Sequence, residues 1–405
     1  MQDLPQFAAE IGRQLARLTR SLANAGPDEQ AVPPGTLQPP FGNSDISSWV
    51  RSIQLWREHG SMLIRHQPAR SCPACGGTGQ RPLFESFDQY PYVDCLACGT
   101  WYIPYVVDEQ LFDEYYKRCP EAYEIVEGFT RQRLEPERTA ADRTRISSYF
   151  AELEPLVSGS RNYLDVGCGV GHSLAVAQER GWSACGLDTS PSIIDAVRKR
   201  GLRIFHPAEV RPDETYGLVS LWETLEHVNA PLAMLSGIVP LLDEDGLLSI
   251  TVPNVQAIEA RMMRQDLAWI NGGAGFGTVH INLFRPSSLE HLLGQAGLQV
   301  IGWDGEYSCN AYELISYMLG RHRGAWDYAR GATVNQSLGE DAVCFLNWVA
   351  PAWSVLSRQL LLTPILKVIA TRSRRPEHVA SLKARHAEAR RLQILASLDA
   401  VYPEP

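Results

Sequence analysis

Four of the nine cysteines lie in two short motifs with the same spacing. Cys72 and Cys75 form one Cys-x-x-Cys-Gly turn, Cys95 and Cys98 form the other, and 19 residues separate Cys75 from Cys95. Two such turns complete a tetrahedral four-thiolate shell that suits Zn²⁺. Such a shell leaves no open position, so a structural zinc is expected, supplying folding energy that about 35 residues cannot gain from a core. A redox pair and free thiols are the alternatives.

A glycine-rich turn lies in the stretch LDVGCGVGH, from Leu164 to His172. Its three glycines allow a sharp turn and the close approach of a ligand: Gly167, Gly169 and Gly171. The dinucleotide fingerprint needs a further glycine where His172 stands. Asp165 would repel a pyrophosphate but suits a cationic amino-acid ligand. Asp188, 23 residues after Asp165, is placed to bind both ribose hydroxyls.

Two carboxylates and two imidazoles form a second candidate site. Glu223, Glu226 and His227 follow an expected strand, and one helical turn there would place them on one face. His280 precedes a later helix. Together these four residues could bind a second divalent metal, better Zn²⁺, Mn²⁺ or Fe²⁺ than Mg²⁺. Alternatively His227 or His280 acts as a base without metal, or Glu226 and His227 only orient the loop.

The elements that position these residues alternate between strand and helix patterns. Strands are expected at 163–166, 183–188, 202–206, 216–222, 246–253 and 298–303, and helices at 172–180, 191–200, 230–242 and 287–297. This alternation predicts an α/β fold with a doubly wound, Rossmann-like sheet, spanning 160–310. The other expected units are a helical segment at 1–68 with a proline-rich linker at 26–45, a zinc ribbon at 69–107, a helical connector or lid at 108–159, and a helical region at 311–405.

Composition narrows the classes of partner. The formal net charge of −9 disfavours a nucleic-acid partner. The start of the chain lacks a signal peptide pattern, and no apolar stretch is long enough to span a bilayer. The five remaining cysteines are scattered, which fits a reducing, cytoplasmic setting. The apolar run with basic residues at 357–375 could rest on a membrane surface, but such a stretch more often packs on its own domain or in a homodimer.

Residues 161–305 resemble the class I methyltransferases that use S-adenosylmethionine (SAM). The resemblance rests on Leu164–Gly171, Leu187–Ser190, Leu221–Val228 and Gly246–Asn254. It implies that the glycine turn binds the methionine part, that the second acid binds the ribose and that 207–209 flanks the adenine. The cofactor-binding residues are then expected to be Asp165, Gly167, Cys168, Gly169, Gly171, Asp188, Thr189, Ala208, Glu209 and Trp222. A doubly wound domain that binds another nucleotide is the alternative.

Further resemblances concern the acceptor. The Glu-x-x-Glu-His pattern with a later His resembles metal-binding small-RNA 2′-O-methyltransferases and ubiquinone-biosynthesis O-methyltransferases. The ribbon resembles that of methyltransferases from sugar and polysaccharide gene clusters and of sugar C-methyltransferases, although the latter carry a second α/β domain where 310–405 is expected to be helical. These resemblances imply O-methylation of a hydroxyl on a sugar, a glycan precursor or a small metabolite. The alternatives are C- or N-methylation of a nucleotide-linked sugar, RNA 2′-O-methylation and a non-catalytic scaffold that holds the cofactor.

Overall fold

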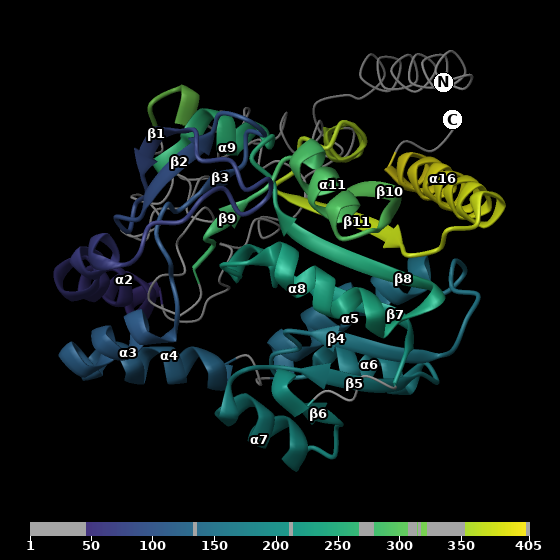
Figure 1. Ribbon diagram of the computed structural model, residues 1–405, viewed down its shortest axis with the longest axis horizontal. Coiled ribbons are helices and arrows are strands. Elements are labelled where there is room, and N and C mark those ends of the chain that lie inside the picture. Colours follow the sequence, from purple (N-terminus) through teal and green to yellow (C-terminus); the bar gives the residue numbers. More distant parts are fainter. Residues whose placement is uncertain are drawn as a thin grey trace, which may run out of the picture.

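The computed structural model describes residues 46–132, 136–209, 214–266, 279–306, 314, 317–321 and 353–401. Residues 1–45 of the expected helical segment, including the linker at 26–45, lie outside these residues, as does much of 311–352. Within the described part, the chain forms two sheets with helices around them (Figure 1).

The larger sheet has seven strands in the order β10-β11-β8-β7-β4-β5-β6. Five neighbouring strands are parallel, whereas β11 runs antiparallel to both β8 and β10. This arrangement confirms the doubly wound α/β sheet. The strands are β4 (Asn162–Val166), β5 (Ser183–Leu187), β6 (Ile204–Phe205), β7 (Tyr216–Trp222), β8 (Leu242–Pro253), β10 (Gln299–Glu306) and β11 (Ile365–Thr371).

The prediction of a purely helical region at 311–405 is wrong at β11. Instead of a surface helix, residues 365–371 form a strand inside the sheet, where Leu366, Val368 and Ala370 are fully buried. The apolar residues of 365–371 are therefore explained by burial on both faces of a central strand, whereas Leu360 in the same run is exposed. No helix within the described ranges is long and apolar enough to cross a membrane.

Neighbouring residues of each strand pack on opposite faces of the sheet. Tyr163 and Leu218 pack with one group of helices, whereas Leu164 and Val219 pack with the other. The first face is covered by α5 (Pro136–Leu153), α6 (His172–Glu179), α7 (Pro191–Lys199) and α16 (Pro376–Val401). The second face is covered by α8 (Pro231–Ile238) and α11 (Pro286–Gln295). The functional loops lie at the sheet edge between these layers.

The cysteine motifs belong to a smaller antiparallel sheet in the order β1-β2-β3-β9. Its strands are β1 (Gln80–Glu85), β2 (Pro91–Cys95), β3 (Trp101–Tyr102) and β9 (Asn282–Leu283). Strand β9 comes from the α/β domain, so the ribbon is joined to that domain by backbone hydrogen bonding. Three helices pack around an aromatic cluster beside this sheet: α2 (Ile46–Leu55), α3 (Glu109–Arg118) and α4 (Pro120–Gln132). In this cluster Trp56 stacks on Tyr90, with ring centroids 4.8 Å apart.

Candidate functional site

The glycine turn follows β4 and leads into α6. Gly167, Gly169 and Gly171 all have positive φ, of 79°, 50° and 78°. A Cβ on Gly167 would lie 2.5 Å from Thr224 Oγ1, so a side chain is excluded there. A Cβ on Gly169 would meet no atom within 4 Å, so this part of the turn borders open space. The turn can thus admit a ligand against its backbone, as the sequence predicts.

Asp188 ties the turn to the end of β5. Its carboxylate accepts hydrogen bonds from Gly169 N (3.1 Å) and Ser190 N (2.9 Å). The side chain is half-buried, and Thr189 beside it is exposed. Ala208 and Glu209 lie in an exposed 3₁₀ turn after β6, where Glu209 accepts from His206 N at 3.0 Å. These positions follow the carboxyl ends of neighbouring parallel strands, where ligands of open α/β sheets bind.

Asp165 lies beneath the turn rather than on its surface. It is 5% exposed, and its carboxylate accepts hydrogen bonds from the Ser173 and Ser220 hydroxyls. Burial raises the pKa of this carboxyl to about 6, although both hydroxyls favour its ionised form. Asp165 therefore fixes the turn from below. The expected role of this carboxylate as a partner of the cofactor amine stays a prediction.

The end of β7 brings together three of the four candidate acid and imidazole residues. Ligand atoms of Glu226, His227 and His280 all lie within 4.8 Å of one another. The 3₁₀ turn Leu225–His227 carries the first two, and the His227 and His280 rings have centroids 5.1 Å apart. Three of the four residues that were expected to share a site therefore lie together.

Glu226 has an unusual environment within this site. Its side chain is fully buried, and neither carboxylate oxygen has a hydrogen-bond partner among the described residues. Burial raises its pKa well above the ordinary value. His227 Nδ1 donates to the Val279 carbonyl at 2.8 Å, so Nε2 carries the lone pair, 4.0 Å from Glu226 Oε1. A carbonyl on the far nitrogen is the usual orientation of a metal-binding or basic imidazole.

Glu223 is not part of this group, contrary to the expected single helical turn. Its φ of 55° puts it in the left-handed region, and the 3₁₀ turn begins only at Leu225. Its carboxylate turns toward α5, where it accepts a hydrogen bond from Arg145 at 2.7 Å. Trp222, the last residue of β7, is anchored through its indole N–H to Ser249 Oγ at 3.0 Å.

The ribbon holds the segment that carries His280. The Tyr92 hydroxyl donates to the His280 carbonyl at 2.5 Å, and β3 pairs with β9 directly after it. Arg70 donates to the Ile281 carbonyl at 2.7 Å and to Asn282 Oδ1 at 3.0 Å. The ribbon is therefore part of the wall of the candidate site.

The four cysteines form a compact cluster whose spacing fits a tetrahedral metal. The Sγ atoms of Cys72 and Cys98 are 3.6 Å apart, as are those of Cys75 and Cys95. Zinc–sulfur bonds of about 2.3 Å give sulfur–sulfur distances of about 3.8 Å in a tetrahedron. Gly76 and Gly99 follow the two motifs with φ of 71° and 72° and close equivalent turns. The donor set and its geometry fit Zn²⁺.

Several residues near the end of β7 are missed by the sequence reasoning. Arg145 and Tyr149 come from α5: Arg145 binds Glu223, and the Tyr149 ring packs against Trp222 with centroids 4.8 Å apart. Arg70 stands in the ribbon but reaches Ile281, which is 211 residues away. No local pattern indicates such contacts, because they arise from packing between distant segments.

Comparisons with known proteins concern the α/β domain that carries this site. Residues 135–302 match a family model described as a methyltransferase domain. A search of curated proteins gave no significant match. Similar solved structures include a SAM-dependent methyltransferase from Archaeoglobus fulgidus, with 18% identity, 56% of this chain and 94% of that chain covered, and a TM-score of 0.38.

Two other solved structures are similar at the same level. One is a SAM-dependent methyltransferase from Clostridium acetobutylicum, with 9% identity, coverage of 61% of this chain and 98% of that chain, and a TM-score of 0.38. The other is the plantazolicin methyltransferase BpumL in complex with a monoazolic desmethylPZN analog and SAH, with 14% identity, coverage of 65% of this chain and 94% of that chain, and a TM-score of 0.38. The family match identifies the α/β domain: this chain carries a SAM-dependent methyltransferase domain. The expected binding of the cofactor at the glycine turn stays a prediction.

Proposed function

We propose that this domain transfers the methyl group of SAM to a hydroxyl of a sugar, a glycan precursor or a small metabolite. The observation that carries the proposal is Glu226, a fully buried carboxylate without a hydrogen-bond partner in the described part of the chain, beside two imidazoles. Burying such a group costs several kcal/mol unless a proton, cation or ligand compensates it. The cluster follows β7, near the glycine turn, where the Glu226 carboxyl would face the reacting atoms.

The imidazole pair supports removal of the acceptor proton. The acceptor oxygen would attack the methyl carbon of SAM, the sulfur–carbon bond would break, and the hydroxyl proton would pass to His227 Nε2. The Val279 carbonyl orients that ring, and the Glu226 carboxylate would stabilise the imidazolium that forms. His280 lies at the same place, held from behind by Tyr92. This division of roles needs a hydroxyl acceptor, because a basic nitrogen acceptor can attack without a base.

A divalent cation fits the same three residues. Glu226 supplies a buried carboxyl group without a hydrogen-bond partner among the described residues, and His227 has its second nitrogen bound to a carbonyl. Two imidazoles with one carboxylate favour Zn²⁺, Mn²⁺ or Fe²⁺ and leave positions open for a substrate. Such an ion would lower the pKa of the acceptor hydroxyl. We further propose that the four-cysteine cluster binds a structural Zn²⁺.

Methyl transfer to defined hydroxyl compounds tests the proposal. The full chain would be incubated with methyl-tritiated SAM and with monosaccharides, nucleotide-linked deoxysugars or catechols, and the products identified as methyl ethers by mass spectrometry. Glu226→Gln should lower the rate by about 100-fold or more, while calorimetry shows unchanged SAM affinity. Glu290→Gln, which alters an exposed carboxylate on α11, is the matched control and should keep full activity.

The outcomes separate the proposed mechanisms. Labelled C- or N-methyl products in place of ethers would contradict a hydroxyl acceptor. Full activity in Glu226→Gln would contradict the assigned role of this cluster. Binding of Mn²⁺ to the zinc-loaded protein, followed by electron paramagnetic resonance and lost in Glu226→Gln, would support the metal-assisted form. Activity that survives chelation but is lost in His227→Ala would support the base form.

A further inference from the structure

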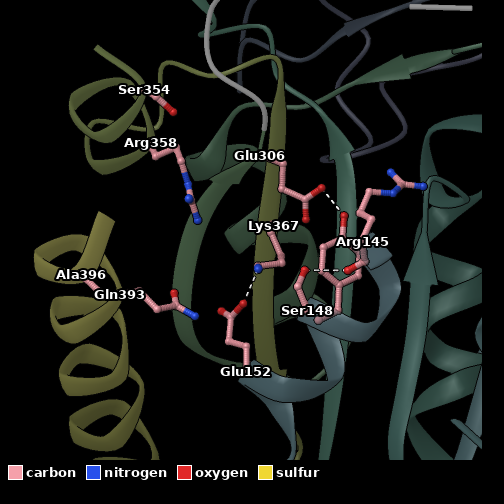
Figure 2. A pocket seen from close by; sticks show the side chains of 10 residues that line it. Arg145, Ser148, Glu152, Glu306, Ser354, Arg358, Lys367, Gln393 and Ala396 are labelled. Atoms are coloured by element: carbon pink, nitrogen blue, oxygen red, sulfur yellow. Dashed lines mark hydrogen bonds and ion pairs between the residues drawn. The ribbon is translucent and has the colours of Figure 1, made fainter. Parts of the chain in front are cut away.

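A cavity of about 550 Å³ lies on the sheet face that α5 and α16 cover. Its walls come from α5, β10, β11, α16 and residues 353–359. Figure 2 shows side chains from these elements, among them Arg358, Glu306 and Gln393, pointing into one space. The volume lies in the usual range of small-molecule sites. The cavity belongs neither to the glycine turn nor to the Glu226 cluster.

The charges at the floor of this cavity are largely paired. Lys367, 5% exposed, forms an ion pair with Glu152. Asp304, 2% exposed, accepts from Arg358 at 2.6 Å and from Arg390 at 3.0 Å. These pairs neutralise one another, so the floor does not select a strongly charged ligand.

Glu306 is the exception at this floor. It is 9% exposed, and its Oε2 accepts a hydrogen bond from the Tyr149 hydroxyl. Its Oε1 has no hydrogen-bond partner among the described residues, although it is buried. Figure 2 shows the Glu306 carboxylate in the cavity, with one oxygen in a hydrogen bond and the other directed away from that bond. A ligand hydroxyl that donates a hydrogen bond to Oε1 would give this buried atom the partner it lacks.

Hydrogen-bond donors stand opposite that free acceptor. Arg358 uses Nε for the Gly305 carbonyl and Nη2 for Asp304, and no partner of Nη1 is found in the described part. The Gln393 amide lines the same space, as does the Ser148 hydroxyl, which donates to the Arg145 carbonyl at 2.6 Å and can still accept a hydrogen bond. A hydroxyl group both donates and accepts, so neighbouring hydroxyls suit a free carboxylate oxygen beside guanidinium and amide donors. An anion would meet Glu306 and Glu152, and a cation would meet Arg145, Arg358 and Lys367.

We propose that this cavity binds a neutral polyhydroxylated ligand, a monosaccharide unit, with Glu306 Oε1 accepting from one hydroxyl and Arg358 donating to its neighbour. The cavity adjoins the end of β7, because Tyr149 packs on Trp222 and Arg145 both lines the cavity and binds Glu223. The identity of this ligand with the methyl acceptor rests on the proposed function. The binding site itself does not.

Saturation-transfer NMR tests the site without knowledge of the acceptor. The full chain, saturated with S-adenosylhomocysteine, would be mixed with D-glucose, L-rhamnose, N-acetyl-D-glucosamine or myo-inositol. At least one probe should bind, and its affinity should fall by about tenfold in Glu306→Ala, where the hydroxyl partner is lost. Ser148→Phe should also abolish binding, because the ring fills the cavity from the exposed face of α5. Glu388→Gln, an exposed carboxylate on α16, should bind as the unaltered chain does.

Two results would overturn the inference: no saturation transfer from any of the four probes, or binding that is unchanged in both Glu306→Ala and Ser148→Phe. Circular dichroism and cofactor affinity show whether each variant is folded. If a sugar is methylated, Ser148→Phe should raise its KM while the SAM affinity stays the same. An unchanged KM would remove the cavity from the acceptor site and leave the proposed function intact, whereas the absence of methyl ether products would contradict the proposed function alone.

Discussion

Two buried carboxylates at the same edge of the sheet differ in their neighbours. Glu226, on the ribbon side, has two imidazoles beside it and no hydrogen-bond partner in the described ranges. Glu306, on the α5–α16 side, has one oxygen on Tyr149 and a floor of paired charges around it. Burial raises the pKa of both groups.

We propose that this difference gives the two buried acids different tasks. A carboxylate beside imidazole nitrogens binds a cation or a proton, whereas a carboxylate beside guanidinium and amide donors binds a ligand hydroxyl. The carboxyl ends of β7 and β10 lie at the same sheet edge, so an acceptor could be held on one side and deprotonated on the other. The two regions also depend on different supports: the ribbon supports the first, and β11 with α16 supports the second.

The largest expected effect comes from breaking the support of the ribbon side. Cys98→Ser should abolish zinc binding, which contributes on the order of 10 kcal/mol to the folding of small zinc modules. Because β3 pairs with β9, hydrogen exchange should accelerate at residues 279–284 as well as in the ribbon. Exchange at β10 and β11 should not change. Cys119→Ser, a buried cysteine outside the cluster, should retain one zinc per chain. Equal protection of 279–284 in both variants would contradict this coupling.

Breaking the support of the cavity side should have a smaller effect. Lys367→Met leaves Glu152 and Asp304 without their buried ammonium partner, at a cost of about 3–5 kcal/mol in the free energy of unfolding. Urea denaturation measures this loss. The double variant Lys367→Met with Glu152→Gln should recover part of it, because the orphaned charge is removed too. Zinc content should stay at one per chain in both, and a loss of zinc would show that the two supports are not independent.

The sequence predicted the local parts of both the fold and the site. The glycine turn follows from Gly167, Gly169 and Gly171, because each positive φ is a local requirement. The cysteine cluster follows from two turns of identical spacing. The placement of Glu226 with His227 follows from adjacency, and only His280 had to be brought from elsewhere.

Contacts between distant segments account for what the sequence did not predict. Strand β11 begins 59 residues after β10 ends, and its apolar run suits a buried helix as well as a central strand. Glu223 was expected to share a face with Glu226, but its left-handed φ and Arg145, 78 residues away, turn it aside. Glu306 meets Tyr149 across 157 residues, so no spacing rule could indicate the cavity.

A third buried acid, Asp165, differs from Glu226 and Glu306 because both of its carboxylate oxygens accept hydrogen bonds. Its pKa of about 6 exceeds the ordinary 3.8, so the folded state keeps a proton that the unfolded chain releases between these values. Stability should therefore fall as pH rises from about 4 to 6, by about 3 kcal/mol in total from this group. Urea unfolding at pH 4.5 and 7 should show about 2 kcal/mol of this loss in the unaltered chain and none of it in Asp165→Asn. The same pH dependence in both would assign it to other groups.

The smallest expected effect concerns the residue that joins the two regions. Arg145 lines the cavity and binds Glu223 at the end of β7, but both side chains are partly exposed, at 31% and 44%. Arg145→Met should therefore lower the free energy of unfolding by less than about 1 kcal/mol. If the two regions hold one acceptor, the same change should raise the KM for a methylated sugar without altering Mn²⁺ binding to the Glu226 cluster. Arg143→Met is the control for the loss of an arginine, because Arg143 is a partly exposed residue of α5 that pairs with Glu179. Identical KM values for both variants would show that Arg145 does not link the cavity to the reaction centre, and the two carboxylates would then serve separate ligands.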